Sequence, residues 1–170
     1  MPRDSLNDKA WFGIRVKARS EFRVTQDLAQ RGFEALLPAH RVRKQWSDRI
    51  RVTEEAVFPG YLFCRFALSE RFQVLASPSV IHVVGIRNTP IPITAVEIDA
   101  VQKIVASQIV LMPWPYLQAG ELVRIDAGPL AGVQGVIIRS DTTNPRIVVS
   151  VTLMQRAVAA EIDREWLGKA

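Results

Sequence analysis

The sequence predicts an α+β fold in two parts: an N-terminal antiparallel sheet with packed helices and a small C-terminal β-barrel. Two observations lead to this prediction. Strand and helix patterns alternate over residues 11–109, whereas after residue 118 only short, β-branched strand patterns between Gly and Pro turns remain. Between the two parts, closely spaced prolines interrupt all periodicity. We therefore expect domains at 1–111 and 119–170, joined by a Pro- and aromatic-containing linker at 112–118.

The N-terminal domain is expected to open with a strand, a helix and a second strand. The apolar residues that alternate along the first strand are Phe12, Ile14 and Val16. Ser20 can cap a helix at 21–31, and Gly32 follows its end. A strand near 33–37 comes next.

The rest of this domain repeats the alternation. Its expected elements are a basic hairpin at 41–51, an apolar strand at 57–66, a helix at 69–77 and a strand at 81–84. Phe72 and Leu75 are predicted to point inward from the short helix. Thr94 and Glu97 form a capping-box pattern that opens the longest helix. The predicted apolar stripe of that helix is Ile98, Val101, Val105 and Ile109. The order strand–helix–strand–strand–helix–strand is typical of a ferredoxin-like layer.

The C-terminal domain is expected to be a barrel of four or five strands. They lie near 122–125, 136–139, 147–153 and 157–162, with Trp166 near a last one. Gly128-Pro129 predicts a tight turn, and Gly132 and Gly135 would let the next strand bend.

Composition narrows the classes of function. The chain has 170 residues, a net charge of +5 and one cysteine, Cys64. No apolar run approaches the roughly 20 residues that cross a bilayer, so we expect a cytoplasmic protein with no membrane partner. The first 112 residues hold 16 Lys and Arg against 11 Asp and Glu, and the remainder is balanced. The N-terminal domain is therefore the part expected to contact nucleic acid.

Two segments resemble a known family. Residues 123–138 have the spacing of the KOW motif, found in ribosomal proteins and in NusG-family transcription elongation factors. The residues that carry this motif are Gly128, Pro129, Gly132 and Gly135. Phe58-Pro59-Gly60-Tyr61 resembles a segment of the NusG N-terminal (NGN) domain, and the first strand, from Trp11, is similar too. An ordinary bent hairpin of another small barrel is the alternative reading of the glycine turn alone.

The resemblance implies a transcription elongation and antitermination factor without enzymatic activity. In this family the NGN domain binds the clamp helices of the largest subunit of bacterial RNA polymerase. The residues predicted for that surface are Trp11, Gly13, Pro59, Tyr61 and Phe63. Alternation places Trp11, Tyr61 and Phe63 opposite the core, where an exposed aromatic patch suits a partner helix. The alternative is that a helix of the same domain covers this face.

Basic residues near the first helix and in the hairpin are predicted to contact nucleic acid. They are Lys17, Arg19, Arg23, Arg41, Arg43 and Lys44. By resemblance, the start of the first helix lies beside the non-template DNA strand. The alternative for each residue is an ordinary solvated charge. Specialised relatives place a base-contacting residue where Asp27 stands, so their sequence recognition does not transfer.

Catalysis is not indicated. His40, His82 and Cys64 have no metal-ligand or nucleophile spacing, so no metal and no cofactor are expected. We expect a monomer whose barrel binds a ribosomal protein or a termination factor. The short joint and residues 149–158 resemble the specialised RfaH or polysaccharide-operon type. A housekeeping NusG factor and a ribosome-associated KOW protein are the alternatives.

Overall fold

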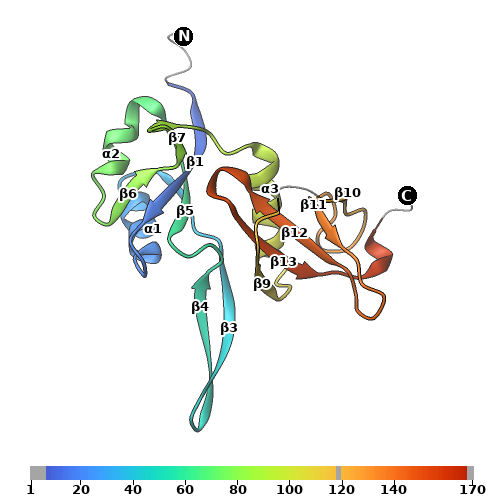
Figure 1. The fold of residues 1–170 in the computed structure, drawn as a ribbon. Helices are drawn as coiled ribbons and strands as arrows, with labels where there is room; N and C mark the ends of the chain where they lie inside the picture. Colours follow the sequence, from blue (N-terminus) through green and yellow to red (C-terminus); the bar gives the residue numbers. More distant parts are fainter. Residues whose placement is uncertain (1–6, 118–119, 168–170) are drawn as a thin grey trace. The chain divides into compact units, whose positions relative to one another are not determined.

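The computed structural model describes residues 7–117 and 120–167, in two compact units (Figure 1). Of the described residues, one unit comprises 7–39 and 54–94, and the other comprises 40–53, 95–117 and 120–167.

The first unit is built on a four-stranded antiparallel sheet. Its strands are β1 (Lys9–Val16), β2 (Glu34–Leu36), β5 (Tyr61–Ala67) and β6 (Val80–Val83), in the order β2-β5-β1-β6. Helix α1 (Glu21–Gln30) connects β1 to β2, and a short 3-10 turn η2 (Leu68–Glu70) with helix α2 (Arg71–Leu75) connects β5 to β6. A small hairpin of β7 (Gly85–Ile86) and β8 (Thr89–Pro90) follows. The order and connections confirm the predicted ferredoxin-like arrangement.

Both helices cover one face of this sheet. The buried core residues of the sheet are Phe12, Ile14, Val16, Leu62, Cys64 and Phe66, as their alternation predicts. Val24 and Leu28 of α1 and Val74 of α2 pack on them. The rings of Phe12 and Phe66 lie with their centroids 4.6 Å apart. This interior satisfies the period-two pattern of β1 and β5.

Two predictions about this unit are wrong. The strand expected at 57–66 begins only at Tyr61, because residues 57–60 form a turn. Phe72 and Leu75 are 69% and 37% exposed, whereas Val74 is fully buried. Helix α2 has five residues, too few for periodicity to fix which side faces the sheet. The Arg71 guanidinium carbon instead lies over the Phe72 ring, 4.9 Å from the centroid of the ring.

Strands β3 (Ala39–Trp46) and β4 (Arg49–Ala56) form a separate two-stranded sheet (Figure 1). The hairpin predicted at 41–51 is therefore confirmed. Ser47 and Asp48 make its turn, the two-residue connection that joins antiparallel strands most tightly. We call this element the basic ribbon.

The second unit contains a five-stranded antiparallel sheet and helix α3 (Ala95–Ala106). The strands are β9 (Leu111–Trp114), β10 (Leu122–Arg124), β11 (Gln134–Ile138), β12 (Arg146–Val151) and β13 (Arg156–Glu161), in the order β10-β11-β12-β13-β9. Two 3-10 turns, η3 (Thr152–Met154) and η4 (Arg164–Trp166), complete it. A bridge between Ile125 and Leu167 brings the start and the end of this domain together. The barrel prediction is confirmed.

The predicted linker and the long helix differ in detail from expectation. Leu111–Trp114, expected to end one domain and begin a linker, forms β9 and pairs with β13. In α3, Ile98 and Val101 are buried as predicted, and Ile104 replaces Val105 as the next buried residue. Ile109 lies beyond the end of the helix. The Glu97 carboxylate accepts a hydrogen bond from the Thr152 N–H at 2.9 Å, which joins α3 to the end of β12.

The glycine turn after β10 packs closely against Trp166. Gly128 has φ +80°, and an added Cβ would lie 2.5 Å from Cε2 of Trp166. Gly32 has a similar φ of +89° with nothing within 4 Å of an added Cβ. Both Ala variants incur left-handed strain of about 1–2 kcal/mol, and only Gly128→Ala adds a packing clash of about 1–3 kcal/mol.

We therefore expect Gly128→Ala to lower the free energy of unfolding by more than Gly32→Ala does. Chemical denaturation followed by circular dichroism compares the two variants. Equal losses would show that Trp166 moves aside at no cost.

Candidate functional site

The side chains opposite the core of the first sheet come from β1 and β5. Pairing places Gly13 beside Phe63 and Arg15 beside Tyr61, with Trp11 two residues before Gly13 on the same face of β1. Trp11 and Tyr61 are half-buried, so part of their aromatic surface reaches solvent. These sequence-predicted residues are thus brought together.

Phe63 departs from the predicted exposed patch. Its side chain is fully buried, and its ring meets Phe58 edge-on, with centroids 6.3 Å apart at 90°. Gly13 is buried as well. Phe63 therefore contributes to packing, and the accessible aromatic surface of this face consists of Trp11 and Tyr61. Alternation could not show this, because it assigns a face without saying what covers it.

Tyr61 carries a cation on its ring. The Arg15 guanidinium carbon lies 4.7 Å from the ring centroid, within the range of a cation–π contact. Arg15 thereby holds a positive charge at the edge of the aromatic face. The sequence pattern did not reveal this contact.

Residues 58–61 form a tight turn that leads into β5. The Tyr61 N–H donates to the Phe58 carbonyl at 3.0 Å, with Pro59 and Gly60 at the two central positions. Gly60 has φ +83°, as the second central residue of a type II turn requires. A Cβ at Gly60 would also collide with the Arg15 guanidinium. Pro59 is exposed at the outside of this turn.

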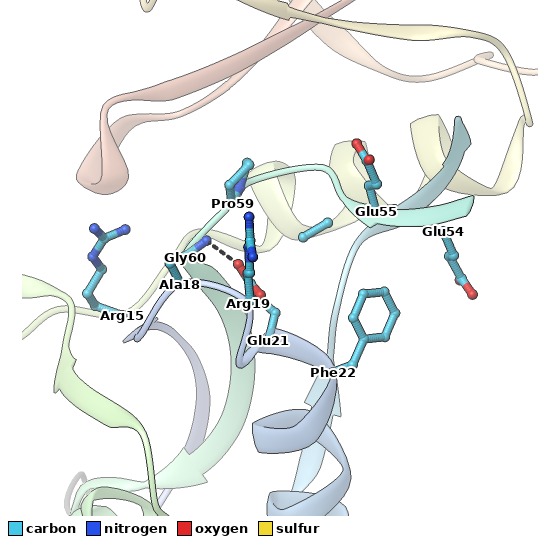
Figure 2. A pocket seen from close by; sticks show the side chains of 10 residues that line it. Arg15, Ala18, Arg19, Glu21, Phe22, Glu54, Glu55, Pro59 and Gly60 are labelled. Atoms are coloured by element: carbon cyan, nitrogen blue, oxygen red, sulfur yellow. Dashed lines mark hydrogen bonds between the residues drawn. The ribbon is translucent and has the colours of Figure 1, made fainter. Parts of the chain in front are cut away.

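A buried carboxylate attaches the turn to helix α1. Oε1 of Glu21, the first residue of the helix, accepts the Gly60 N–H at 2.8 Å (Figure 2). Glu21 is only 7% exposed, and its negative charge lies at the positive end of the helix dipole. The Gly60 carbonyl in turn accepts the Val16 N–H at 2.9 Å. The end of β1, the start of α1 and the turn are thus fixed together.

Ser20 does not play the predicted capping role. It precedes α1, but its side chain makes no capping hydrogen bond. Its backbone N–H instead donates to the Lys17 carbonyl at 3.1 Å. Glu21 was missed from the sequence because its partner lies 39 residues away.

A hollow of about 460 Å³ opens beside this junction (Figure 2). Its lining combines the guanidinium groups of Arg15 and Arg19, the Phe22 ring, which is 46% exposed, and the turn residues Pro59 and Gly60. Glu54 and Glu55 contribute carboxylates to the same hollow. It therefore offers aromatic surface for stacking and cations for a phosphate, but with acidic groups that restrict how much negative charge it accepts.

Comparison with known proteins identifies the family. Residues 9–102, more than half of the chain, match the family described as "Transcription termination factor nusG". The chain belongs to the NusG family.

Relatives and a solved structure agree with this membership. The chain is 28% identical over 168 residues to the transcription termination/antitermination protein NusG of Vibrio parahaemolyticus, covering 91% of this chain and 92% of that protein. NusG of Escherichia coli K12 is 27% identical over 176 residues, covering 95% and 97%. The fold resembles that of Thermotoga maritima NusG with a TM-score of 0.59 at 17% identity, covering 95% of this chain and 97% of that one.

The chain is thus a NusG-family transcription termination/antitermination factor. The relatives are transcription factors and not enzymes. None of the helices in the described residues has the length and hydrophobicity needed to cross a bilayer. Within residues 7–117 and 120–167, no three His, Cys, Asp or Glu side chains are grouped as around a metal ion.

Cys64 behaves as a structural residue of this NusG-family core. Burial, reinforced by the charges of Glu70 and Glu34, raises the pKa of its thiol to about 12. Since a thiolate is the nucleophilic form of cysteine, the group is unreactive at neutral pH.

The basic residues predicted at the start of α1 are exposed. Lys17 and Arg19 lie in the loop between β1 and α1, and Arg19 adopts φ +63°. Arg23 is held more firmly, because its Nη2 donates to Ser79 Oγ at 2.7 Å. Arg23 is therefore fixed to Ser79, whereas Lys17 and Arg19 extend from an exposed loop.

Asp27, one turn after Arg23, is engaged within the domain. It accepts hydrogen bonds from Ser77 Oγ and from Arg31 Nε, the latter at 2.8 Å. The Ser77 hydrogen bond and the Arg31 charge lower the pKa of the carboxyl. These bonds fix α1 to the end of α2, so Asp27 serves the fold.

The remaining predicted residues lie in two other places. Arg41, Arg43 and Lys44 are exposed on β3 of the basic ribbon. The KOW glycines lie in the barrel: the Gly132 N–H donates to the Ile125 carbonyl at 2.7 Å, and Gly135 packs against the Val148 carbonyl of β12. Gly128-Pro129 begins the turn between β10 and β11. The KOW residues are thus structural.

The Glu21–Gly60 bond yields a stability prediction. In Glu21→Ala the Gly60 N–H loses its acceptor, and a buried unpaired donor costs about 1–3 kcal/mol. Glu21→Gln keeps an oxygen at the acceptor position, so we expect it to lose less than half as much. Urea unfolding measures both losses, and equal destabilisation by the two substitutions would contradict the role given to this hydrogen bond.

Proposed function

We propose that this factor binds the clamp helices of the largest subunit of RNA polymerase through the face of Trp11 and Tyr61. The observation that carries the proposal is the accessible aromatic surface opposite the core, with Arg15 stacked on Tyr61 at 4.7 Å. Aromatic anchors beside a guanidinium are the residues enriched at the centres of protein interfaces. Pro59, exposed on the adjoining turn, extends the same surface.

Bound there, the NGN domain would lie over the transcription bubble, with Lys17, Arg19 and Arg23 beside the non-template strand. Lys and Arg neutralise phosphates without reading sequence, which suits a factor that accompanies polymerase along many sequences. The hollow beside α1 adds the exposed Phe22 ring, on which an unpaired base can stack. Such contacts would suppress pausing and promote antitermination.

Each of the two domains expected from the sequence is given a separate role. We assign polymerase binding to residues 1–111 and recruitment of a further factor to the barrel at 119–170, such as a ribosomal protein or a termination factor. The balanced charge of residues 113–170 does not favour direct binding of the barrel to ribosomal RNA.

Two roles within the NusG family, a specialised factor and a housekeeping factor, each have support. The short joint before the barrel, part of which is strand β9, supports a specialised factor that acts on particular operons. Similarity over almost the whole length to NusG termination/antitermination proteins supports a housekeeping factor equally well. A gene located inside a biosynthetic operon, together with a second NusG-family gene elsewhere, would favour the specialised role.

The polymerase surface is tested with Trp11→Ala/Tyr61→Ala. Removal of two aromatic anchors should weaken binding to an isolated clamp-helix fragment by about 2–4 kcal/mol, measured by titration calorimetry. Trp46→Ala removes an exposed aromatic side chain of the basic ribbon and serves as the control. Unchanged affinity in a folded double variant would refute the surface. Phe63 is unsuitable for this test, because it is buried.

The DNA contact is tested with Lys17→Glu/Arg19→Glu. Both side chains are exposed, so the domain should remain folded. We expect readthrough of a terminator in single-round transcription to fall, because the reversed charges repel the strand. Binding to the clamp-helix fragment should stay unchanged. Full readthrough by this variant would show that the loop does not touch DNA.

A further inference from the structure

The part of the basic ribbon nearest its turn is strongly positive, whereas Glu54 and Glu55 lie farther along β4. Residues 41–51 hold five Lys and Arg residues and one Asp, a net charge of +4, compared with +5 for the whole chain. All the charged side chains in this stretch are exposed. The turn end of this narrow two-stranded element thus carries a dense positive charge.

The cations lie on both faces of the ribbon. Arg51 of β4 stacks over the ring of Trp46 of β3, at 6.0 Å from the centroid, so these two side chains share a face. Alternation along β4 puts Arg49 on that face too. Arg41 and Arg43 are an odd number of residues from Trp46 on β3, which places them on the opposite face.

Apolar side chains are exposed between these cations. Trp46, Ile50 and Val52 are 57%, 60% and 58% exposed. These side chains are large and apolar. Neither face of the ribbon is buried, however, so they do not contribute to a hydrophobic core. Their exposure indicates a surface that contacts a partner offering both phosphates and apolar edges.

We propose that the basic ribbon binds duplex DNA by lying in its major groove. Cations on two opposite faces require phosphates on two sides, and a groove bounded by two strands provides them, whereas a single strand meets one face. The major groove of B-DNA, about 12 Å wide, admits a two-stranded β-ribbon, but the major groove of A-form RNA is too deep and narrow. Thymine methyl groups on the groove floor suit the apolar side chains.

This duplex contact is distinct from the single-strand contact proposed at the start of α1, and it requires no polymerase. The full-length protein can therefore be tested alone. Fluorescence anisotropy would measure its affinity at several salt concentrations for a 24-base-pair DNA duplex, for one of its strands and for an RNA duplex of the same sequence, the probe lengths being set at about two helical turns. We expect the DNA duplex to bind most tightly.

Three double variants separate the two faces. Arg41→Ala/Arg43→Ala and Arg49→Ala/Arg51→Ala each remove two cations from one face, and Lys9→Ala/Arg87→Ala removes two exposed cations outside the ribbon. We expect each ribbon variant to lower duplex affinity about tenfold or more and to reduce the salt slope by about two, since each lost phosphate contact contributes about 0.9. The control should change either quantity much less. Circular dichroism confirms that all three are folded.

The results of these measurements test whether the ribbon binds in the major groove. Loss of affinity in both ribbon variants, with the duplex preferred, supports it. Loss in only one variant would show that one face binds, which overturns the proposal. Tighter binding of the single strand or of the RNA duplex, or equal loss in the control, would overturn it as well. A failure here leaves the clamp-helix and terminator experiments unaffected, because those depend on other residues.

Discussion

The hydrogen bond between the Glu21 carboxylate and the Gly60 N–H is the contact that fixes the turn beside the aromatic face of the first sheet. It joins the first residue of α1 to a turn 39 positions away, inside an almost completely buried site. A charged acceptor makes such a bond stronger than a neutral one, and the helix dipole favours the same negative charge. Because the turn is fixed there, Pro59, Tyr61 and the stacked Arg15 keep one arrangement.

This junction also places two chemically different surfaces side by side. The half-buried aromatic side chains of Trp11 and Tyr61 lie on the sheet, and the cations Lys17 and Arg19 lie in the loop between β1 and α1. Arg15 contributes to both, since it covers Tyr61 and lines the hollow that Arg19 also lines. In the proposed function, the protein contact and the nucleic-acid contact would therefore be made by neighbouring residues around the junction of β1 and α1.

Sequence patterns predicted the fold well where tertiary packing follows simple periodicity. Alternation in β1 and β5 identified the core face, and β-branched residues with glycine turns identified the barrel. Patterns failed where tertiary contacts decide: Glu21 finds its partner 39 residues away, and the ring of Phe63 packs against Phe58 of the preceding turn. They also failed for α2, which is too short for periodicity to indicate its buried side. They failed for β9 as well, because its prolines suggested an irregular linker.

The prolines of β9 have a consequence for how copies of the protein behave toward one another. β9 is the outer strand of the five-stranded sheet, next to β13, and it contains Pro113, with Pro115 directly after it. Proline has no N–H, so Pro113 leaves this edge strand with one donor fewer for an approaching strand. A proline on an edge strand therefore disfavours edge-to-edge pairing between two copies of this sheet.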